Sequence, residues 1–199
     1  MQQYSTACER NRDPILEVLQ RVFPVEGRVL EISAGTGMHS AWFAPRLPGL
    51  DWLPTDRDPV ALASIASWRE AVGAPNLRAP VYLDTRDPRW PVAEVDAVLC
   101  CNMIHISPWE SAQGLFAGLA RVLARDGVAV LYGPFRFSGE WTSPSNARFD
   151  QSLRSRDPSW GVRDLDDVVA LAQEHGLALE ETVAMPANNH CQVFRRDGS

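Results

Sequence analysis

The sequence predicts an α/β domain with a doubly wound, mostly parallel sheet of seven strands, helices on both faces and an antiparallel last strand. Three observations support this prediction. Strand-like and helix-like hydrophobic patterns alternate along the 199 residues, with turn residues between them. The continuous apolar run at 95–101 is typical of a central parallel strand buried on both faces. A glycine turn at 33–37 follows the first predicted strand and opens a helix.

Local signals place the individual elements. Asp13-Pro14 and Asp58-Pro59 each combine a capping residue with a proline at the first helical position. Ser107 and Glu110 have the spacing of a capping box. Strands are therefore expected at 28–32, 50–55, 78–83, 95–101, 127–132, 177–184 and 191–196. Helices are expected at 14–23, 38–46, 59–72 and from 107 to about 123.

The second half of the chain contains one irregular stretch. Residues 133–163 are too long for a simple connector and predict a substrate-lid insertion, with a short helix at 147–154. Order resumes with a helix that Asp164 caps and Gly176 ends. The last two strands are expected to pair around the loop 185–190. No linker or repeat interrupts the pattern, so we expect residues 1–199 to form one domain.

Composition excludes several classes of function. All 19 basic residues are arginines, so no lysine can form a Schiff base, bind phosphate in a P-loop or act as a general base. The net charge of −6 disfavours a nucleic-acid partner and suits a small uncharged or cationic one. No apolar run approaches the roughly 18 residues that span a bilayer, and residues 1–13 are not signal-like, so we expect a cytoplasmic protein without a membrane partner. The cysteines are expected to be reduced, buried and unrelated to metal binding: Cys8, Cys100, Cys101 and Cys191.

The glycine turn indicates a ligand that approaches the backbone closely. Gly35 and Gly37 stand where a strand passes into a helix, and glycine allows both a sharp turn and close approach of a ligand. An ordinary tight turn is the alternative. The dinucleotide fingerprint requires glycine or alanine where this chain has Ser40, which disfavours NAD.

Three successive predicted strands each end in a carboxylate. Glu31 precedes the glycines, Asp56 ends the second strand and Asp84 ends the third. A carboxylate at the position of Asp56 can accept two ribose hydroxyl groups. Together the carboxylates would repel a pyrophosphate but would accept a cationic sulfonium that carries an amino group and a ribose. A helix cap or a solvated turn is the alternative for Asp56 or Asp84 taken alone.

The chain resembles the class I S-adenosylmethionine-dependent methyltransferases, whose motif Glu-x-x-x-Gly-x-Gly matches Glu31 to Gly37. Six further segments resemble the methyltransferase-like protein 26 family: 9–16, 102–108, 131–135, 143–146, 160–164 and 185–189. This resemblance covers nearly the whole chain. It implies a Rossmann-like methyltransferase fold and S-adenosylmethionine (SAM) as the cofactor, without a defined acceptor.

The same resemblance assigns roles to individual residues. It implies that Gly35 and Gly37 pass over the methionine part of SAM and that Asp56 holds the ribose. It further implies that Asp84 reaches the adenine amino group and that Asn102 lines the site.

His105 is the candidate catalytic residue. It follows the fourth predicted strand, and an imidazole titrates near neutral pH, so it could accept the proton of an incoming hydroxyl or amine. In the alternative, His105 only orders the turn into the next helix. A thiolate or selenolate acceptor would need little help from a base.

Candidate substrate residues lie where the predicted crevice opens. Asn188 and Asn189 could bind a polar ligand, although asparagine also suits turns. Aromatic residues here could instead pack the lid, and Arg12 could be a surface residue rather than the ligand of a carboxylate. The candidates are Tyr4, Asn11, Arg12, Trp109, Tyr132, Phe135, Asn146, Trp160, Asn188 and Asn189.

Taken together, the sequence predicts a SAM-dependent methyltransferase that transfers a methyl group in line to a sulfur, selenium, nitrogen or oxygen atom of a small molecule. A protein or RNA methyltransferase is one alternative, but the acidic net charge does not favour it. The other is a noncatalytic module that binds the cofactor or a partner. We expect no metal ion and no nucleic acid.

Overall fold

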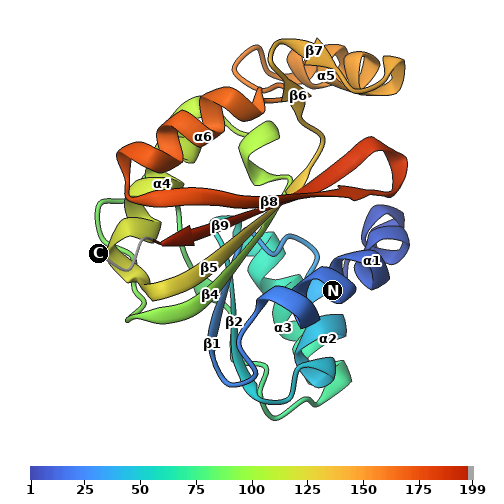
Figure 1. Ribbon diagram of the computed structural model, residues 1–199. Coiled ribbons are helices and arrows are strands. Elements are labelled where there is room, and N and C mark those ends of the chain that lie inside the picture. Colours follow the sequence, from blue (N-terminus) through green and yellow to red (C-terminus); the bar gives the residue numbers. More distant parts are fainter. Residues whose placement is uncertain (197–199) are drawn as a thin grey trace.

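The structure, a computed structural model, describes residues 1–196 and contains the predicted seven-stranded sheet (Figure 1). The strand order is β3-β2-β1-β4-β5-β9-β8. Neighbours from β3 to β5 pair in parallel, whereas β9 is antiparallel to both β5 and β8. The mostly parallel sheet with an antiparallel last strand is confirmed. The strands are β1 (Gly27–Ile32), β2 (Leu50–Asp56), β3 (Val81–Tyr82), β4 (Val95–Cys101), β5 (Leu123–Gly133), β8 (Leu177–Met185) and β9 (Asn189–Arg196).

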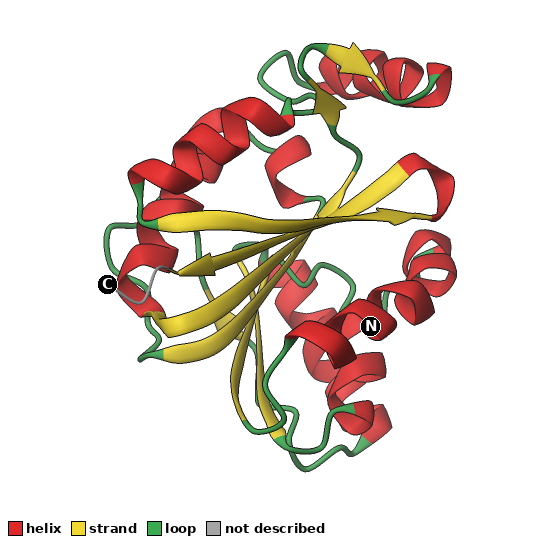
Figure 2. Ribbon diagram, viewed as in Figure 1, coloured by secondary structure: helices red, strands yellow, loops and turns green. Residues whose placement is uncertain are grey.

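Helices cover both faces of the sheet, as Figure 2 shows in red. One face carries α1 (Thr6–Val22), α2 (Met38–Phe43) and α3 (Pro59–Val72), and the other carries α4 (Trp109–Val122) and α6 (Leu165–Glu174). Short 3-10 helices occupy Ala44–Arg46, Met103–His105 and Pro186–Asn188. Among the described residues, no helix has the length and apolarity needed to cross a membrane.

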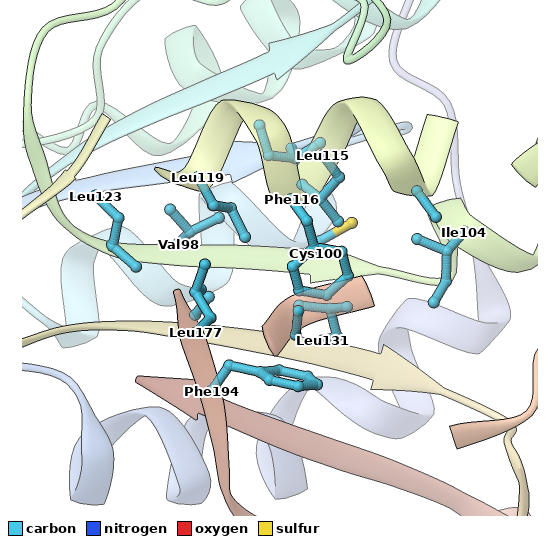
Figure 3. Close-up of a cluster of buried hydrophobic side chains, with 14 of the residues drawn as sticks. Val98, Cys100, Ile104, Leu115, Phe116, Leu119, Leu123, Leu131, Leu177 and Phe194 are labelled. Atoms are coloured by element: carbon cyan, nitrogen blue, oxygen red, sulfur yellow. The ribbon is translucent and has the colours of Figure 1, made fainter. Parts of the chain in front are cut away.

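A packed apolar layer fixes the positions of the strand ends. On the α4 side, Val98 and Leu131 of the sheet lie against Phe116 of α4 (Figure 3), and all three side chains are buried. The Phe116 and Phe194 rings meet edge to face with centroids 5.5 Å apart. Full burial of one such side chain stabilises the fold by about 1.5–3 kcal/mol. The loops at the carboxyl ends of the strands therefore rest on a rigid base.

The predicted start of the first helix is wrong. The helix begins at Thr6, where the Ser5 hydroxyl accepts a hydrogen bond from the Cys8 N–H at 3.2 Å, and Pro14 lies inside it. An internal proline costs a helix about 3 kcal/mol. Complete burial of Ile15 and Leu19 offsets that cost.

Two other local predictions need correction. The Ser107 hydroxyl donates to the Met103 carbonyl at 2.7 Å, and α4 begins after Pro108 without a side-chain cap, so the predicted capping box does not form. The strand predicted at 78–83 shortens to Val81–Tyr82. Pro80, directly before it, has no N–H to donate to the ladder, and on its N-terminal side only an isolated bridge between Leu77 and Trp52 continues the pairing with β2.

The insertion at 133–163 contains the hairpin β6 (Arg136–Phe137) and β7 (Glu140–Trp141), followed by α5 (Pro144–Arg156). Figure 1 shows it beyond the end of α6 and away from the helices of the opposite face. The predicted cap of α6 is confirmed, because the Asp164 carboxylate accepts from the Asp166 N–H. The last two strands pair as a hairpin, as expected.

Candidate functional site

The glycine turn is tied to the end of β2 by two hydrogen bonds. The Gly35 N–H donates to Asp56 Oδ2 at 2.9 Å, and the Ala34 N–H donates to the Thr55 carbonyl at 2.8 Å. Gly35 has a φ of 57°, and a Cβ built on it would meet no atom nearer than 4.0 Å. The backbone at Gly35 therefore faces open space, as close approach of a ligand requires.

Glycine is required at position 37 for a different physical reason. Its φ is 85°, and a Cβ added there would lie 2.7 Å from the Ile65 Cα of α3. The residue is required for close packing of the turn against α3. That Gly37 passes over the methionine part of SAM stays a prediction.

We expect Gly37→Ala to lower the free energy of unfolding by about 1–3 kcal/mol, because it combines a left-handed φ with a backbone clash. Gly73→Ala is the matched control. Gly73 has a φ of 62° but no atom within 4 Å of an added Cβ, so it should show only the conformational strain of about 1 kcal/mol. Urea unfolding of both variants measures the difference. Equal losses would contradict the packing role of Gly37.

The two strand-end aspartates lie at one cavity but have different partners. Asp56 is 7% exposed and also accepts from the Asp58 N–H at 2.9 Å. Asp84 accepts two hydrogen bonds from the Arg86 guanidinium, at 3.0 and 2.6 Å, and lies 3.7 Å from Arg57. The hydrogen bond from Arg86 holds the pKa of Asp84 down at about 2, so this carboxylate is ionised throughout the physiological range.

A cavity of about 230 Å³ opens at the carboxyl ends of β1, β2 and β4. Parallel sheets place their ligands at this edge. The predicted residues that line it are Gly35, Asp56, Asp84 and Trp160. Sequence reasoning missed several others, although their positions next to the ends of predicted strands were a usable signal. They include Ser33, Arg57, Leu83, Cys101 and Ile106.

Glu31 lies beneath this cavity and not on its wall. Its side chain is 2% exposed and accepts from Ser40 Oγ at 2.6 Å and from Trp52 Nε1 at 2.7 Å. Burial raises the pKa of Glu31 to about 7, and the nearby Asp56 charge adds to the increase. Ser40 replaces the small residue of a dinucleotide turn and holds this carboxyl group.

The cysteines differ in exposure. Cys100 and Cys191 are buried as predicted, whereas Cys8 and Cys101 are only partly buried. Within the part of the chain that the structure describes, no three His, Cys, Asp or Glu side chains form a set that could hold a metal ion.

Comparison with known proteins identifies the family. A family model described as "Protein of unknown function (DUF938)" matches residues 2–196. The chain belongs to the DUF938 family. The narrower resemblance to the methyltransferase-like protein 26 family stays a prediction.

Solved structures share the fold of this DUF938 chain. The mitomycin 7-O-methyltransferase MmcR has a TM-score of 0.81 at 15% identity, over 96% of this chain and 54% of its own. The S-adenosylmethionine-dependent methyltransferase SibL, in its apo form, has a TM-score of 0.78 at 19% identity, and the match covers 96% of this chain and 55% of SibL. CalO1, a methyltransferase in calicheamicin biosynthesis solved in an SAH-bound form, has a TM-score of 0.71 at 18% identity. The match covers 93% of this chain and 54% of CalO1. The chain thus spans about half the length of these proteins, and the Rossmann-like methyltransferase fold is confirmed.

His105 of this DUF938 chain is fully buried beside the cavity and does not line it. Its Nδ1 accepts a hydrogen bond from the Arg163 N–H at 3.2 Å, and its carbonyl accepts from the Gly161 N–H at 2.9 Å. Burial, and then the Arg163 charge, lower the pKa of His105 to about 3. The ring is therefore neutral and carries its proton on Nε2, with the lone pair of Nδ1 already used. This geometry favours the alternative in which His105 orders the turn.

A pair of substitutions separates the two roles of His105. We expect His105→Leu to lower the free energy of unfolding by about 1–3 kcal/mol, because it leaves the Arg163 N–H buried without an acceptor. His105→Asn, whose amide oxygen can take the place of Nδ1, should lose less. Urea unfolding tests this difference. Equal losses would contradict the acceptor role of Nδ1, and a fully stable His105→Asn that alone abolishes turnover would favour the base role.

Asn102 lies between β4 and the turn that carries His105. It has a φ of 60°, and its N–H donates to the Tyr132 carbonyl at 2.7 Å. Its side-chain Oδ1 would lie 3.1 Å from a Cβ on Gly133, so the amide points toward β5 and not onto the wall of the cavity. Contact of Asn102 with a cofactor stays a prediction.

The structure joins two of the predicted substrate segments. The Asn146 side chain donates to the Asn188 carbonyl at 2.9 Å and connects the insertion to the tip of the β8–β9 hairpin. The Asn189 amide donates to the carbonyls of Pro186 and Ala187, as the turn alternative expects.

The N-terminal candidates mostly contact other side chains. Asn11 Oδ1 lies 2.8 Å from His39 Nε2, and the Arg12 guanidinium stacks 3.6 Å above the centre of the Trp42 ring. Tyr4 is exposed and bonds to Glu9.

The remaining aromatic candidates are packed in the way the lid alternative describes. Tyr132 is 4% exposed, and Phe135 is fully buried against the His105 ring at a centroid distance of 4.9 Å. Trp109 lies under the Arg163 guanidinium at 5.5 Å and lines a different cavity.

Proposed function

We propose that the chain is a SAM-dependent methyltransferase that acts on a small-molecule acceptor. The observation that carries the proposal is the cavity at the carboxyl ends of the strands, where the open backbone of Gly35 meets the carboxylates of Asp56 and Asp84. The shared fold, with CalO1 in an SAH-bound form, supports it.

The donor and acceptor groups of the cavity fit this cofactor. Each oxygen of Asp56 accepts one backbone N–H, and a carboxylate has about four lone-pair positions, so two ribose hydroxyls can still be bound. Asp84 would reach the adenine amino group while Arg86 holds it, and Leu83 and Ile106 supply apolar contacts for the base. When bound, SAM supplies an electrophilic methyl group on a sulfonium.

The residues of the chain would align the reactants and exclude water. Pockets for drug-sized ligands begin at about 300 Å³, more than the 230 Å³ of this cavity. A bound cofactor would therefore extend beyond this volume, and Ile106, which is 41% exposed, and Trp160 would contact it from the lining. Alignment of an in-line displacement accounts for much of the acceleration that such a site provides.

A small acceptor fits the segments that remain to form a substrate site beside the cofactor cavity. The insertion and the β8–β9 tip, joined through Asn146 and Asn188, form a short wall of limited area. The net charge of −6 does not favour a nucleic acid as the acceptor. The acceptor atom would be sulfur, selenium, nitrogen or oxygen, and a sulfur or selenium nucleophile suits a site whose histidine is neutral and buried.

Isothermal titration calorimetry with SAM, S-adenosylhomocysteine and NAD tests the proposal. We expect saturable binding of the first two and none of NAD. Failure of the folded protein to bind either SAM or its product would refute it. Binding without turnover on a panel of thiols, amines and hydroxyl compounds would support the noncatalytic alternative, and turnover only on protein or RNA would support the macromolecular one.

A further inference from the structure

A second cavity, of about 520 Å³, lies between α4, α6 and the insertion. The segment 103–108 separates it from the cavity of the proposed function, because Met103, Ile106 and Ser107 line that cavity. Trp109 and Arg163 line the second one. Its volume is within the range of about 300–1,000 Å³ that small-molecule sites have.

One wall of this cavity carries three guanidinium groups, from Arg136 of β6, Arg154 of α5 and Arg163, and the Asp164 carboxylate also lines the cavity beside Arg136. Arg163 donates to the carbonyls of Ile104 and Ser107 at 2.9 and 2.7 Å. Within residues 1–196, no carboxylate lies within 4.0 Å of it. Its positive charge is half-buried and touches no carboxylate, although Asp150 and Glu110 act on it from further away, and it also donates to the Ser159 carbonyl at 2.9 Å.

The other two arginines of this wall are only partly compensated. Arg136 is 3.9 Å from Asp164, at the limit of an ion pair, and its buried Nε has no hydrogen-bond partner. Arg154 pairs with Asp150 at 2.8 Å, but its side chain is 51% exposed. We call these three residues the arginine wall. It favours a ligand with a carboxylate or a similar anionic group.

A second wall is one face of α6. Asp167, Ala170, Leu171 and Glu174 all line the cavity, at the spacing that places residues on the same side of a helix. This acidic wall has a carboxylate at each end and apolar side chains between them. Neither Asp167 nor Glu174 forms an ion pair within 4.0 Å in the described part of the chain.

Groups of opposite charge thus line the same cavity, and the exposed side chains of Asp167 and Glu174 have no ion-pair partner on the arginine wall. A simple anion would be attracted by one wall and repelled by the other. A molecule with both charges would complement both walls. Val162, Leu171 and Trp109 form apolar surface between them that suits an aliphatic side chain.

We propose that this cavity binds a small zwitterion of the α-amino-acid type. Its carboxylate lies against the arginine wall, its ammonium group against Asp167, and its aliphatic part on Leu171 and Trp109. The site is distinct from the cavity at the strand ends, because the two share no lining residue.

Titration of the full chain with three matched probes tests the charge requirement. The titrations are carried out at constant ionic strength, and binding is measured from the NMR chemical shifts of the protein. L-Leucine carries both charges, 4-methylpentanoate has only the carboxylate and 3-methylbutylamine has only the ammonium group. We expect saturable binding of leucine and about threefold weaker binding of either analogue, since Asp167, Glu174 and Arg154 are exposed and an exposed ion pair contributes little. Equal binding of leucine and 4-methylpentanoate would overturn the zwitterion assignment, and absence of saturable binding of all three would overturn the site.

Variants of each wall localise the site. Arg136→Gln and Asp167→Asn should each weaken leucine binding about threefold. Arg121→Gln is the control, because Arg121 is an exposed arginine of α4 that bonds to the Ala117 carbonyl and lies outside the cavity. Thermal unfolding confirms that each variant is folded. Unchanged affinity in both wall variants, or equal weakening in the control, would refute the location.

Discussion

Asp56→Ala is expected to weaken SAM binding more than about a hundredfold. The substitution removes the acceptor for two ribose hydroxyls, and a hydrogen bond to a charged group contributes about 1.5–3 kcal/mol. It also frees the Gly35 N–H, which Asp56 Oδ2 accepts at 2.9 Å, so the open turn at Gly35 loses its fixed position. Calorimetric titration of the variant with SAM and with S-adenosylhomocysteine measures both effects together.

Two further variants separate ligand contact from the support of the turn. Asp56→Asn keeps one oxygen for the Gly35 N–H but loses the charge, so its affinity should lie between those of the wild type and Asp56→Ala. Asp58→Ala removes the neighbouring helix cap, at 2.9 Å from the Val60 N–H, and should cost about 1 kcal/mol of stability without changing SAM affinity. Wild-type affinity in Asp56→Ala would remove Asp56 from the ribose site.

The sequence predicts the sheet well because periodicity reports burial. The apolar run at 95–101 forms β4 with the predicted bounds, and the glycine turn does join β1 to α2. Helix starts were harder to predict. Asp13-Pro14 has the local signature of a helix start, but Ser5 provides the actual cap and burial of Ile15 and Leu19 carries the helix through the proline. Long-range packing outweighed the local signal there.

Prediction of the site succeeded where residue type and strand end coincide. Asp56 and Asp84 follow strands and lie on the cavity, whereas Glu31, from the same motif, turns inward to Ser40 and Trp52. Sequence spacing gives the end of a strand but not the direction of a side chain. The prediction that His105 lies at the cavity failed for a related reason. Its partner Arg163 lies 58 residues away in the sequence, and no local pattern reveals such a contact.

The buried carboxyl group of Glu31 should make the free energy of unfolding depend strongly on pH. Burial raises its pKa from the ordinary 4.5 to about 7, so between these values the folded state holds a proton that the unfolded state releases. The free energy of unfolding therefore falls as pH rises through this window, by about 1.4 kcal/mol per pH unit and about 3 kcal/mol in total. Below pH 4.5 the contribution is fully present, and above pH 7 it is lost.

Glu31→Gln isolates this contribution, because the amide oxygen can still accept from Ser40 and Trp52 while the side chain no longer titrates. The difference in unfolding free energy between the variant and the wild type should shift by about 3 kcal/mol in favour of the variant between pH 4.5 and 8. Urea unfolding at closely spaced pH values measures it. Glu17→Gln, at an exposed position of α1, should follow the wild type throughout. A constant difference for Glu31→Gln would mean that the carboxyl group is ionised in the fold, and Ser40 and Trp52 would then stabilise a buried charge instead of a neutral acid.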